Sequence, residues 1–98
     1  MNRKYLRMRE VMEICGVNRD FVLRLEKENL IFPVVQRRQK LYPLDQVDRV
    51  RVAHVLFSEL GVNLEGIEVA LHLRDQLISM RRRFNRVLRA LAEDLRAQ

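Results

Sequence analysis

The spacing of apolar residues predicts a chain built mainly of helices. Between residues 8 and 15, apolar residues recur three and four positions apart, which places them on one face of a helix. Gly16 suits the left-handed conformation that ends such a helix, and Asn18 can cap a second helix from residue 19 to about residue 28. The predicted buried side of this second helix consists of Phe21, Val22 and Leu25. Together the two helices predict a helix-turn-helix.

The segment after the second helix predicts a basic β hairpin, or wing. Asn29 can adopt the left-handed conformation that ends the helix. We expect residues 30–32 and 40–42 to form two short strands, with residues 33–39 between them. Tyr5 and Leu6 can form a further short strand, so the predicted wing sheet has two or three strands.

Two more helices are predicted after the wing. Pro43 is tolerated in the first turn of a helix, and Gly61 ends that helix. Its apolar face consists of Leu44, Val47, Val50, Ala53, Leu56, Phe57 and Leu60. Asn63 can cap a fourth helix, and from residue 64 onward only the tolerable Gly66 interrupts the helical sequence.

The fourth predicted helix carries a heptad repeat. About thirty residues of helix span roughly 45–50 Å, which is longer than a domain of this size can cover. We expect its proximal half to pack on the third helix and its distal half to form a homodimeric coiled coil; the alternative is a helix that folds back onto its own domain. Residues 1–62 are thus predicted to form a winged helix-turn-helix domain and residues 63–98 a long dimerisation helix. The seam residues are Ala70, Leu73, Leu77, Met80, Phe84, Val87 and Leu91.

Composition and charge indicate the kind of partner. With 48% hydrophobic and 33% charged residues and only three Gly and two Pro, the chain is expected to fold. The net charge of +6 indicates a polyanionic partner and favours nucleic acid, although a ribosomal or lipid partner fits the same sign. No apolar run approaches the roughly 20 residues of a membrane helix, so we expect a cytoplasmic protein without a membrane partner.

The sequence lacks the residue patterns of an enzyme. His54 and His72 lie in separate predicted helices, without acidic or Cys partners at metal-ligand spacing. A Gly-rich phosphate loop and paired catalytic carboxylates are also absent. Cys15 is the single cysteine and lies among apolar residues, which favours a small core residue. We therefore expect no catalytic residues, no metal and no cofactor.

Two stretches resemble a known protein family. Residues 16–31, followed by the basic segment 36–40, predict the second helix of a helix-turn-helix and its wing. Residues 61–71, Gly-Val-Asn-Leu-Glu-Gly-Ile-Glu-Val-Ala-Leu, resemble the segment after the winged helix in the heat-shock repressor (HspR) branch of the MerR superfamily. They are also similar to the small CbpM-type modulators of J-domain co-chaperones. The resemblance covers roughly residues 5–91 and implies a mainly α, MerR-like winged helix-turn-helix followed by a coiled-coil helix.

The resemblance implies a transcriptional regulator that binds double-stranded DNA, of a heat-shock or chaperone operon. Arg19 can bind a guanine, and Asn18 can cap the helix or read an adenine, of which capping is favoured. Arg24 and Lys27 would reach phosphates, and the wing residues would contact the backbone or minor groove. The alternative for this set is a solvated basic surface. The candidate DNA-binding residues are Asn18, Arg19, Arg24, Lys27, Arg37, Arg38, Lys40 and Tyr42.

The recognition helix departs from the family pattern. MerR-type helices resemble Arg-Tyr-Tyr-Glu, whereas residues 23–26 here are Leu-Arg-Leu-Glu, so the arginine is displaced by one position and both aromatics are missing. This departure favours the alternative function, a modulator that binds the J-domain of a co-chaperone. Many MerR-type sensors carry an effector domain beyond the coiled coil; this sequence ends there, so we expect no small-molecule effector.

Overall fold

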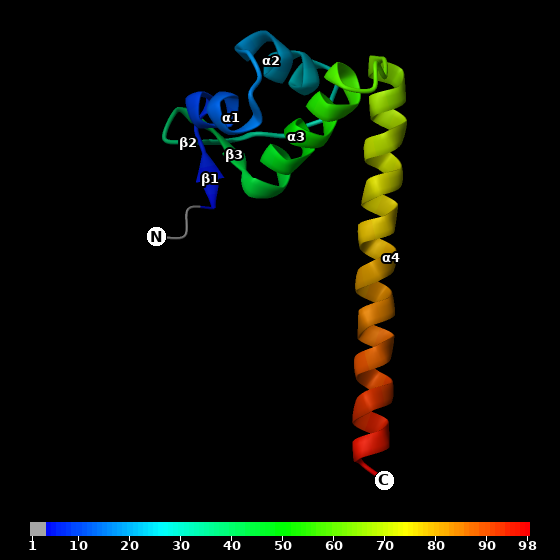
Figure 1. The fold of residues 1–98 in the computed structure, drawn as a ribbon. Coiled ribbons are helices and arrows are strands. Elements are labelled where there is room, and N and C mark those ends of the chain that lie inside the picture. The colour runs from blue at the N-terminus through cyan, green and yellow to red at the C-terminus, as the bar shows by residue number, and fades with distance from the viewer. Residues whose placement is uncertain (1–3) are drawn as a thin grey trace.

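The computed structural model describes residues 4–98 as a small mixed domain from which one long helix extends (Figure 1). The elements run in the order β1 (Tyr5–Leu6), α1 (Met8–Cys15), α2 (Arg19–Lys27), β2 (Val34–Gln36), β3 (Gln39–Pro43), α3 (Leu44–Ser58) and α4 (Leu64–Arg96). Helices dominate, and the strands form one small antiparallel sheet. The expected fold, a winged helix-turn-helix with a long C-terminal helix, is confirmed.

The ends of α1 and α2 and the start of α4 lie where local sequence signals place them, whereas α3 ends at Ser58, before the Gly61 that is expected to end it. Gly16 has φ 65° and closes α1, its N–H donating to the carbonyl of Met12. The Asn18 side chain accepts a hydrogen bond from the Phe21 N–H at 2.9 Å, so its favoured role as the cap of α2 is confirmed. Asn29 has φ 58° just beyond α2. These signals act within one turn of the chain, which is why the sequence alone reveals them.

The sheet has the strand order β1-β3-β2, with both pairs antiparallel. The expected strand at residues 30–32 is wrong, because the strand that pairs with β3 is Val34–Gln36. Leu30 and Ile31 are only 3% and 1% exposed and are part of the hydrophobic core. The Phe32 N–H donates to Gln46 Oε1 of α3 at 2.9 Å rather than to a strand. An apolar run with strand-like composition is thus a buried linker.

The wing turns through two residues, Arg37 and Arg38. Gln36 pairs with Gln39, and the two arginines between them have φ 50° and 63°. A two-residue hairpin turn with both central residues at positive φ is of type I′, a conformation that usually selects Asn and Gly. The connection between the strands is therefore two residues, shorter than the expected residues 33–39. The sequence gives no sign of a tight turn here, because residues 36–39 contain neither Gly nor Asn.

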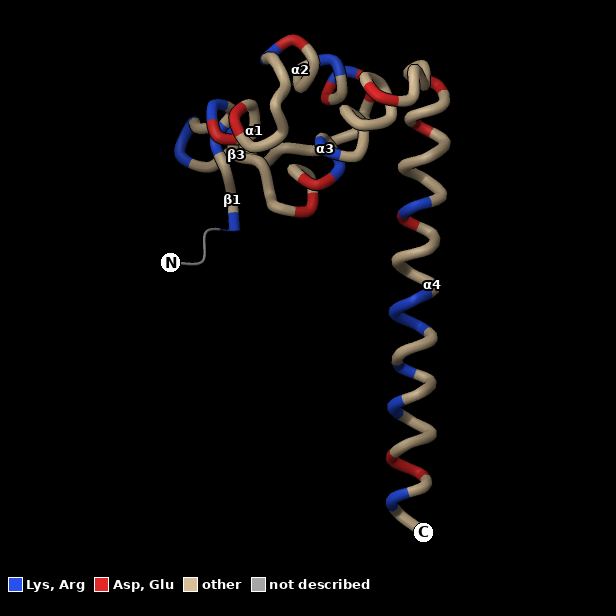
Figure 2. Tube along the Cα trace, viewed as in Figure 1, with Lys and Arg blue, Asp and Glu red and all other residues tan. Residues whose placement is uncertain are grey.

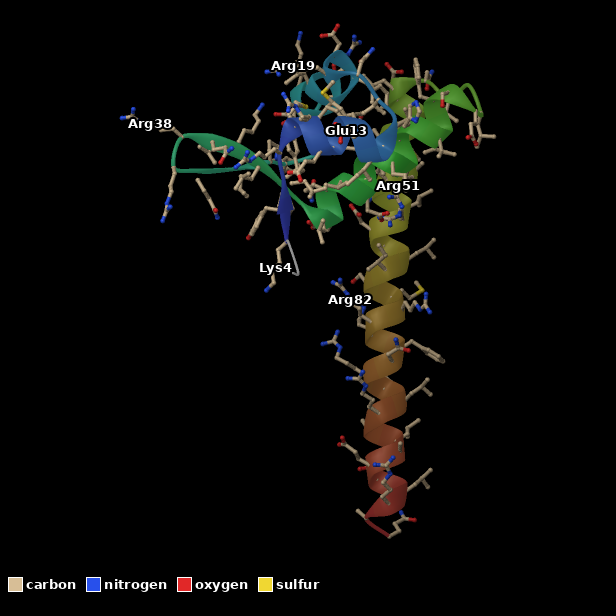
Figure 3. All side chains as sticks on the ribbon, turned by 60° about the vertical axis from the view of Figure 1, so that its left-hand side comes forward. Lys4, Glu13, Arg19, Arg38, Arg51 and Arg82 are labelled. Atoms are coloured by element: carbon tan, nitrogen blue, oxygen red, sulfur yellow. The ribbon has the colours of Figure 1, made fainter. Side chains whose placement is uncertain are left out.

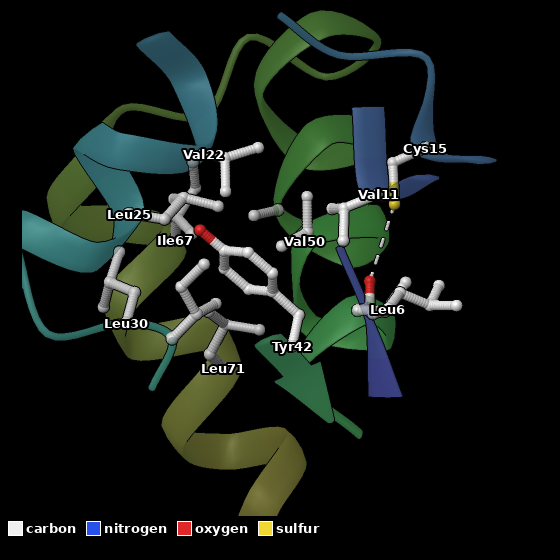
Figure 4. Close-up of a cluster of buried hydrophobic side chains, with 13 residues drawn as sticks. Leu6, Val11, Cys15, Val22, Leu25, Leu30, Tyr42, Val50, Ile67 and Leu71 are labelled. Atoms are coloured by element: carbon white, nitrogen blue, oxygen red, sulfur yellow. Dashed lines mark hydrogen bonds between the residues drawn. The ribbon is translucent and has the colours of Figure 1, made fainter. Parts of the chain in front are cut away.

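One hydrophobic core joins the sheet to all four helices of the described residues (Figure 4). The Tyr42 ring lies at its centre, surrounded by side chains of α1, α2 and α3. Ile67 and Leu71 of α4 are 0% exposed in the same cluster, so the proximal part of α4 packs on the domain as expected. Gly66 leaves room for Val62, which precedes α4, because a Cβ at Gly66 would lie 2.6 Å from Val62 Cγ1.

Ion pairs hold α4 against α3. Arg49 contacts Asp75 at 2.6 Å and donates from Nε to the carbonyl of Leu30 at 2.8 Å. In a second ion pair the cation is on α4 and the anion on α3, because Arg74 contacts Asp48. Beyond these two ion pairs α4 extends away from the domain and does not fold back onto it (Figure 1). Residues 79–98 are all exposed. None of the helices in residues 4–98 combines the length and apolar character of a membrane span.

Candidate nucleic-acid interface

α2 presents a polar outer face above a buried inner one. Val22 and Leu25 are 0% exposed and anchor the helix on the core. Arg19 begins the helix and lies exposed at the domain surface (Figure 3). Lys27, about two turns further on, is also exposed. The start of α2 is therefore open to a large ligand.

Arg24 differs from the other cations of α2 by having an ion pair within the helix. At 100° per residue, Lys27 lies about 80° and Arg24 about 140° around the helix axis from Arg19, so all three are on the side opposite the buried Val22 and Leu25. The Nε of Arg24 lies 3.7 Å from Glu28 Oε1. The charge of Arg24 is therefore partly balanced by a neighbour on its own helix.

The wing tip carries two exposed arginines. Arg37 and Arg38 occupy the two-residue turn, and both are exposed. Figure 3 shows Arg38 projecting from the end of the hairpin, on the side of the domain away from α4. Residues 34–40 contain no acidic side chain. None of the ion pairs within residues 4–98 involves Arg19, Arg37 or Arg38. These charges remain available to an anionic partner.

Tyr42 is not a surface contact. Its side chain is 0% exposed and fills the centre of the core, so the prediction that Tyr42 binds DNA is wrong. Strand alternation directs it inward, and its hydroxyl reaches through the core to donate a 2.7 Å hydrogen bond to Glu26 Oε2. Burial, followed by this hydrogen bond, raises the pKa of Tyr42, so the hydroxyl remains a donor at neutral pH.

Lys40 is already paired within the protein. Its Nζ lies 2.6 Å from Glu26 Oε1, on the carboxylate that also accepts from Tyr42. The Lys40 side chain is 43% exposed, whereas that of Glu26 is only 14% exposed. Among the predicted wing cations, Lys40 therefore has its charge balanced locally, in contrast to Arg37 and Arg38.

Sequence reasoning did not identify Glu26 as a residue that joins α2 to the wing. A signal was present, because Lys40 and Tyr42 are two positions apart on a strand and so share a face. A carboxylate on the wing-facing side of α2 can satisfy both. The pattern could not show that the two elements approach each other closely enough for this contact.

Lysine and arginine residues lie in two parts of the molecule. Some lie on the domain, on the wing and α2 and also on α1 and α3, and others lie along the exposed part of α4 (Figure 2). The α4 group comprises Arg81, Arg82, Arg83, Arg86 and Arg89, and Figure 3 shows Arg82 well below the wing and α2. The two groups therefore cannot contact the same few phosphates from one chain.

The remaining candidate for chemistry is Cys15. It is 8% exposed, and its Sγ lies 3.6 Å from the carbonyl of Val47, within range of a weak S–H hydrogen bond. Burial raises the pKa of the thiol, with smaller opposing effects of Arg51 and Asp48, so little reactive thiolate forms at neutral pH. Cys15 is a core residue, as interpreted from its neighbours. Across residues 4–98, no group of three or more His, Cys, Asp or Glu is placed to hold a metal ion.

Comparison with known proteins places this arrangement in a family. A family model described as MerR HTH family regulatory protein matches residues 6–89, which include the helix-turn-helix, the wing, α3 and most of α4. No curated protein and no solved structure matches the chain in these comparisons. The match covers most of the chain, and the fold agrees with it. The chain belongs to the MerR family of helix-turn-helix regulatory proteins.

Proposed function

We propose that this MerR-family regulator binds duplex DNA with the start of α2 in the major groove and the wing on the backbone. The observation that carries the proposal is the placement of Arg19, Arg37 and Arg38. All three are exposed and take part in none of the ion pairs within residues 4–98. In a winged helix-turn-helix, the first residues of the second helix reach base edges while flanking cations contact phosphates.

The proposed contacts have different roles. Arg19 offers a planar fork of donors that can bind a guanine at two acceptors, which provides sequence discrimination. Arg37 and Arg38 offer charge at the end of a protruding hairpin, which suits the phosphate backbone or minor groove and gives little discrimination. Asn18 is occupied as the cap, and the Lys40 charge is balanced by Glu26, so both contribute indirectly.

The functional unit of this proposal is a homodimer through α4. The predicted seam lies uncovered in the single chain, and its large members are each more than half exposed: Leu73, Leu77, Met80, Phe84, Val87 and Leu91. A continuous apolar strip of this kind exceeds what a monomer usually leaves in water. A second copy of the chain covers it and places two α2 helices on two half-sites.

Binding to DNA at several salt concentrations tests the wing. Arg37→Ala with Arg38→Ala should weaken binding to all sequences alike and flatten the salt dependence by up to about two phosphate contacts. Arg86→Ala with Arg89→Ala removes the same charge from α4 and serves as the control. Equal slopes for the two double variants would show that the wing arginines are merely a solvated surface.

The base contact is tested at a selected site. Arg19→Ala should cost roughly 1–3 kcal/mol on the preferred sequence and little on random DNA. Equal losses on both would show that Arg19 reads no base. Because the resemblance of residues 61–71 to heat-shock repressors suggests a chaperone operon, DNA from such an operon is the first sequence to examine.

A second candidate is binding to the J-domain of a co-chaperone. Residues 23–26 favour it, because Leu23 occupies the arginine position of the DNA-reading pattern, Arg24 and Leu25 occupy its two aromatic positions, and Leu25 is fully buried. Glu65 and Glu68 are exposed on α4 and suit the basic surface of a J-domain. If Glu65→Lys with Glu68→Lys abolishes regulation while the Ala variant of Arg19, Arg37 and Arg38 retains it, this second function replaces the first.

A further inference from the structure

The Glu26 carboxylate joins the recognition helix to the wing with both of its oxygens. Oε1 lies 2.6 Å from Lys40 Nζ, and Oε2 accepts the 2.7 Å hydrogen bond from the Tyr42 hydroxyl. The Glu26 side chain is 14% exposed, so both contacts form in a partly desolvated place, where charge-assisted hydrogen bonds are strong and directional.

The β3 side of this contact is rigid. Tyr42 pairs with Leu6 of β1, Lys40 pairs with Val35 of β2, and the Tyr42 ring is locked in the core. Glu26 and Arg19 lie about two helical turns apart, which returns them to nearly the same side of α2. A change in the Glu26 contacts therefore alters the angle at which Arg19 is presented relative to the wing tip.

The contact also affects the charge offered to DNA. Glu26 balances the ammonium of Lys40, which lies on β3 just beyond the wing arginines. A phosphate and the Glu26 carboxylate would compete for the same ammonium group. While the Glu26–Lys40 pair is intact, the two tip arginines of the wing can contact DNA, and the ammonium of Lys40 cannot.

We propose that Glu26 is a positioning residue for DNA recognition, which fixes α2 relative to the wing and keeps Lys40 away from phosphates. The inference rests on the proposed DNA-binding function. It assigns Glu26 an effect on sequence preference although Glu26 itself touches no nucleotide. Preference depends on Arg19 and the wing reaching one duplex together, whereas non-specific affinity depends mainly on the number of free cations.

Glu26→Gln is the principal test, because glutamine keeps an acceptor for Tyr42 and loses only the charge that holds Lys40. The freed ammonium should add about one phosphate contact, steepening the logarithmic salt slope on random DNA by roughly 0.9. The preference for the selected site over random DNA should fall by roughly 5- to 150-fold, the range that one misplaced base contact gives.

Glu28→Gln is the matched control. It removes the same charge from the same helix, and among residues 4–98 the ion pair of Glu28 is with Arg24 of α2, at 3.7 Å, and not with the wing. We expect its preference for the selected site to equal that of the unmodified protein. Circular dichroism melts of both variants verify that the domain is folded.

Lys40→Met separates the two effects of the pair. It frees no ammonium, so the preference should fall without a steeper slope. The double variant, Glu26→Gln with Lys40→Met, should lose the added slope of the single Glu26 change. This design remains decisive even if one variant folds poorly, because a merely structural role changes the melting temperature but not the salt slope.

The outcomes separate a failure of the proposed DNA binding from a failure of the proposed role of Glu26. If the unmodified protein shows neither salt-dependent DNA binding nor a preferred sequence, the proposed function fails and the inference falls with it. If the unmodified protein binds with preference, but Glu26→Gln matches Glu28→Gln in slope and in preference, only the role of Glu26 is refuted.

Discussion

Replacing Leu77 with aspartate should abolish the proposed dimer. Leu77 occupies the middle of the α4 seam, and its side chain is 66% exposed in the single chain. Fully burying a leucine contributes about 1.5–3 kcal/mol, so covering this exposed part contributes about 1–2 kcal/mol per chain. In the proposed symmetric dimer both copies contribute this amount, which makes the total about 2–4 kcal/mol.

This energy corresponds to a large change in dimer affinity. Since about 1.4 kcal/mol changes a dissociation constant tenfold, removing both leucines weakens the dimer by roughly 30- to 700-fold. The aspartate adds the cost of removing a carboxylate from water, so the true effect should lie at or above the upper end. A micromolar dimer would therefore become a monomer at any practical concentration.

Sedimentation equilibrium over a range of concentrations measures the effect. Ser79→Asp is the control, because it introduces the same charge two residues away, on the outer face of α4. We expect the Ser79 variant to remain dimeric and the Leu77 variant to be monomeric with a folded domain. A monomeric unmodified protein at tens of micromolar, or a Leu77 variant of unchanged mass, would refute the reasoning.

Three further predictions concern stability and are measured by denaturant or thermal unfolding. Tyr42→Phe should cost about 1.5 kcal/mol at neutral pH, the low end for a hydrogen bond to a charged group. Because the folded pKa of Tyr42 is raised, its stabilising contribution is present below the unfolded value near 10 and is lost as pH rises above it, so the gap between the two proteins should narrow in alkali. A constant gap would contradict this assignment. Leu71→Ala should cost about 2–5 kcal/mol, whereas Leu73→Ala, at an exposed position on the same helix, should leave the domain stable and weaken only the dimer. Gly66→Ala gains about 1 kcal/mol of helix propensity but must displace Val62, so we expect a net loss of up to about 2 kcal/mol; a gain would show that Val62 moves freely.

The sequence by itself determined the features that depend on neighbouring residues. The conformations of Gly16 and Asn29 and the caps at Asn18 and Asn63 follow from hydrogen bonds and backbone preferences within a single turn. The length of α4 follows from the absence of strong helix breakers after residue 63, and the exposed basic character of the wing follows from its composition. Local free-energy terms of this kind do not depend on what packs nearby.

Only the tertiary structure decided which side chains the core takes in. Residues 30–32 have strand-like composition, yet Leu30 and Ile31 are buried in the core, and the strand begins only at Val34. Tyr42 follows a basic segment, and its ring nevertheless points inward. The choice depends on the volume and hydrogen-bond partners supplied by distant elements, which a periodic pattern does not contain.

The candidate site divides in the same way. Arg19, Arg37 and Arg38 could be selected from sequence because exposed charge at a helix start or hairpin tip needs no partner within the chain. Glu26 could not be selected, because its role exists only where α2 meets β3 and one carboxylate satisfies both Lys40 and Tyr42. Contacts between elements far apart in sequence are set by packing, and packing is a property of the whole fold.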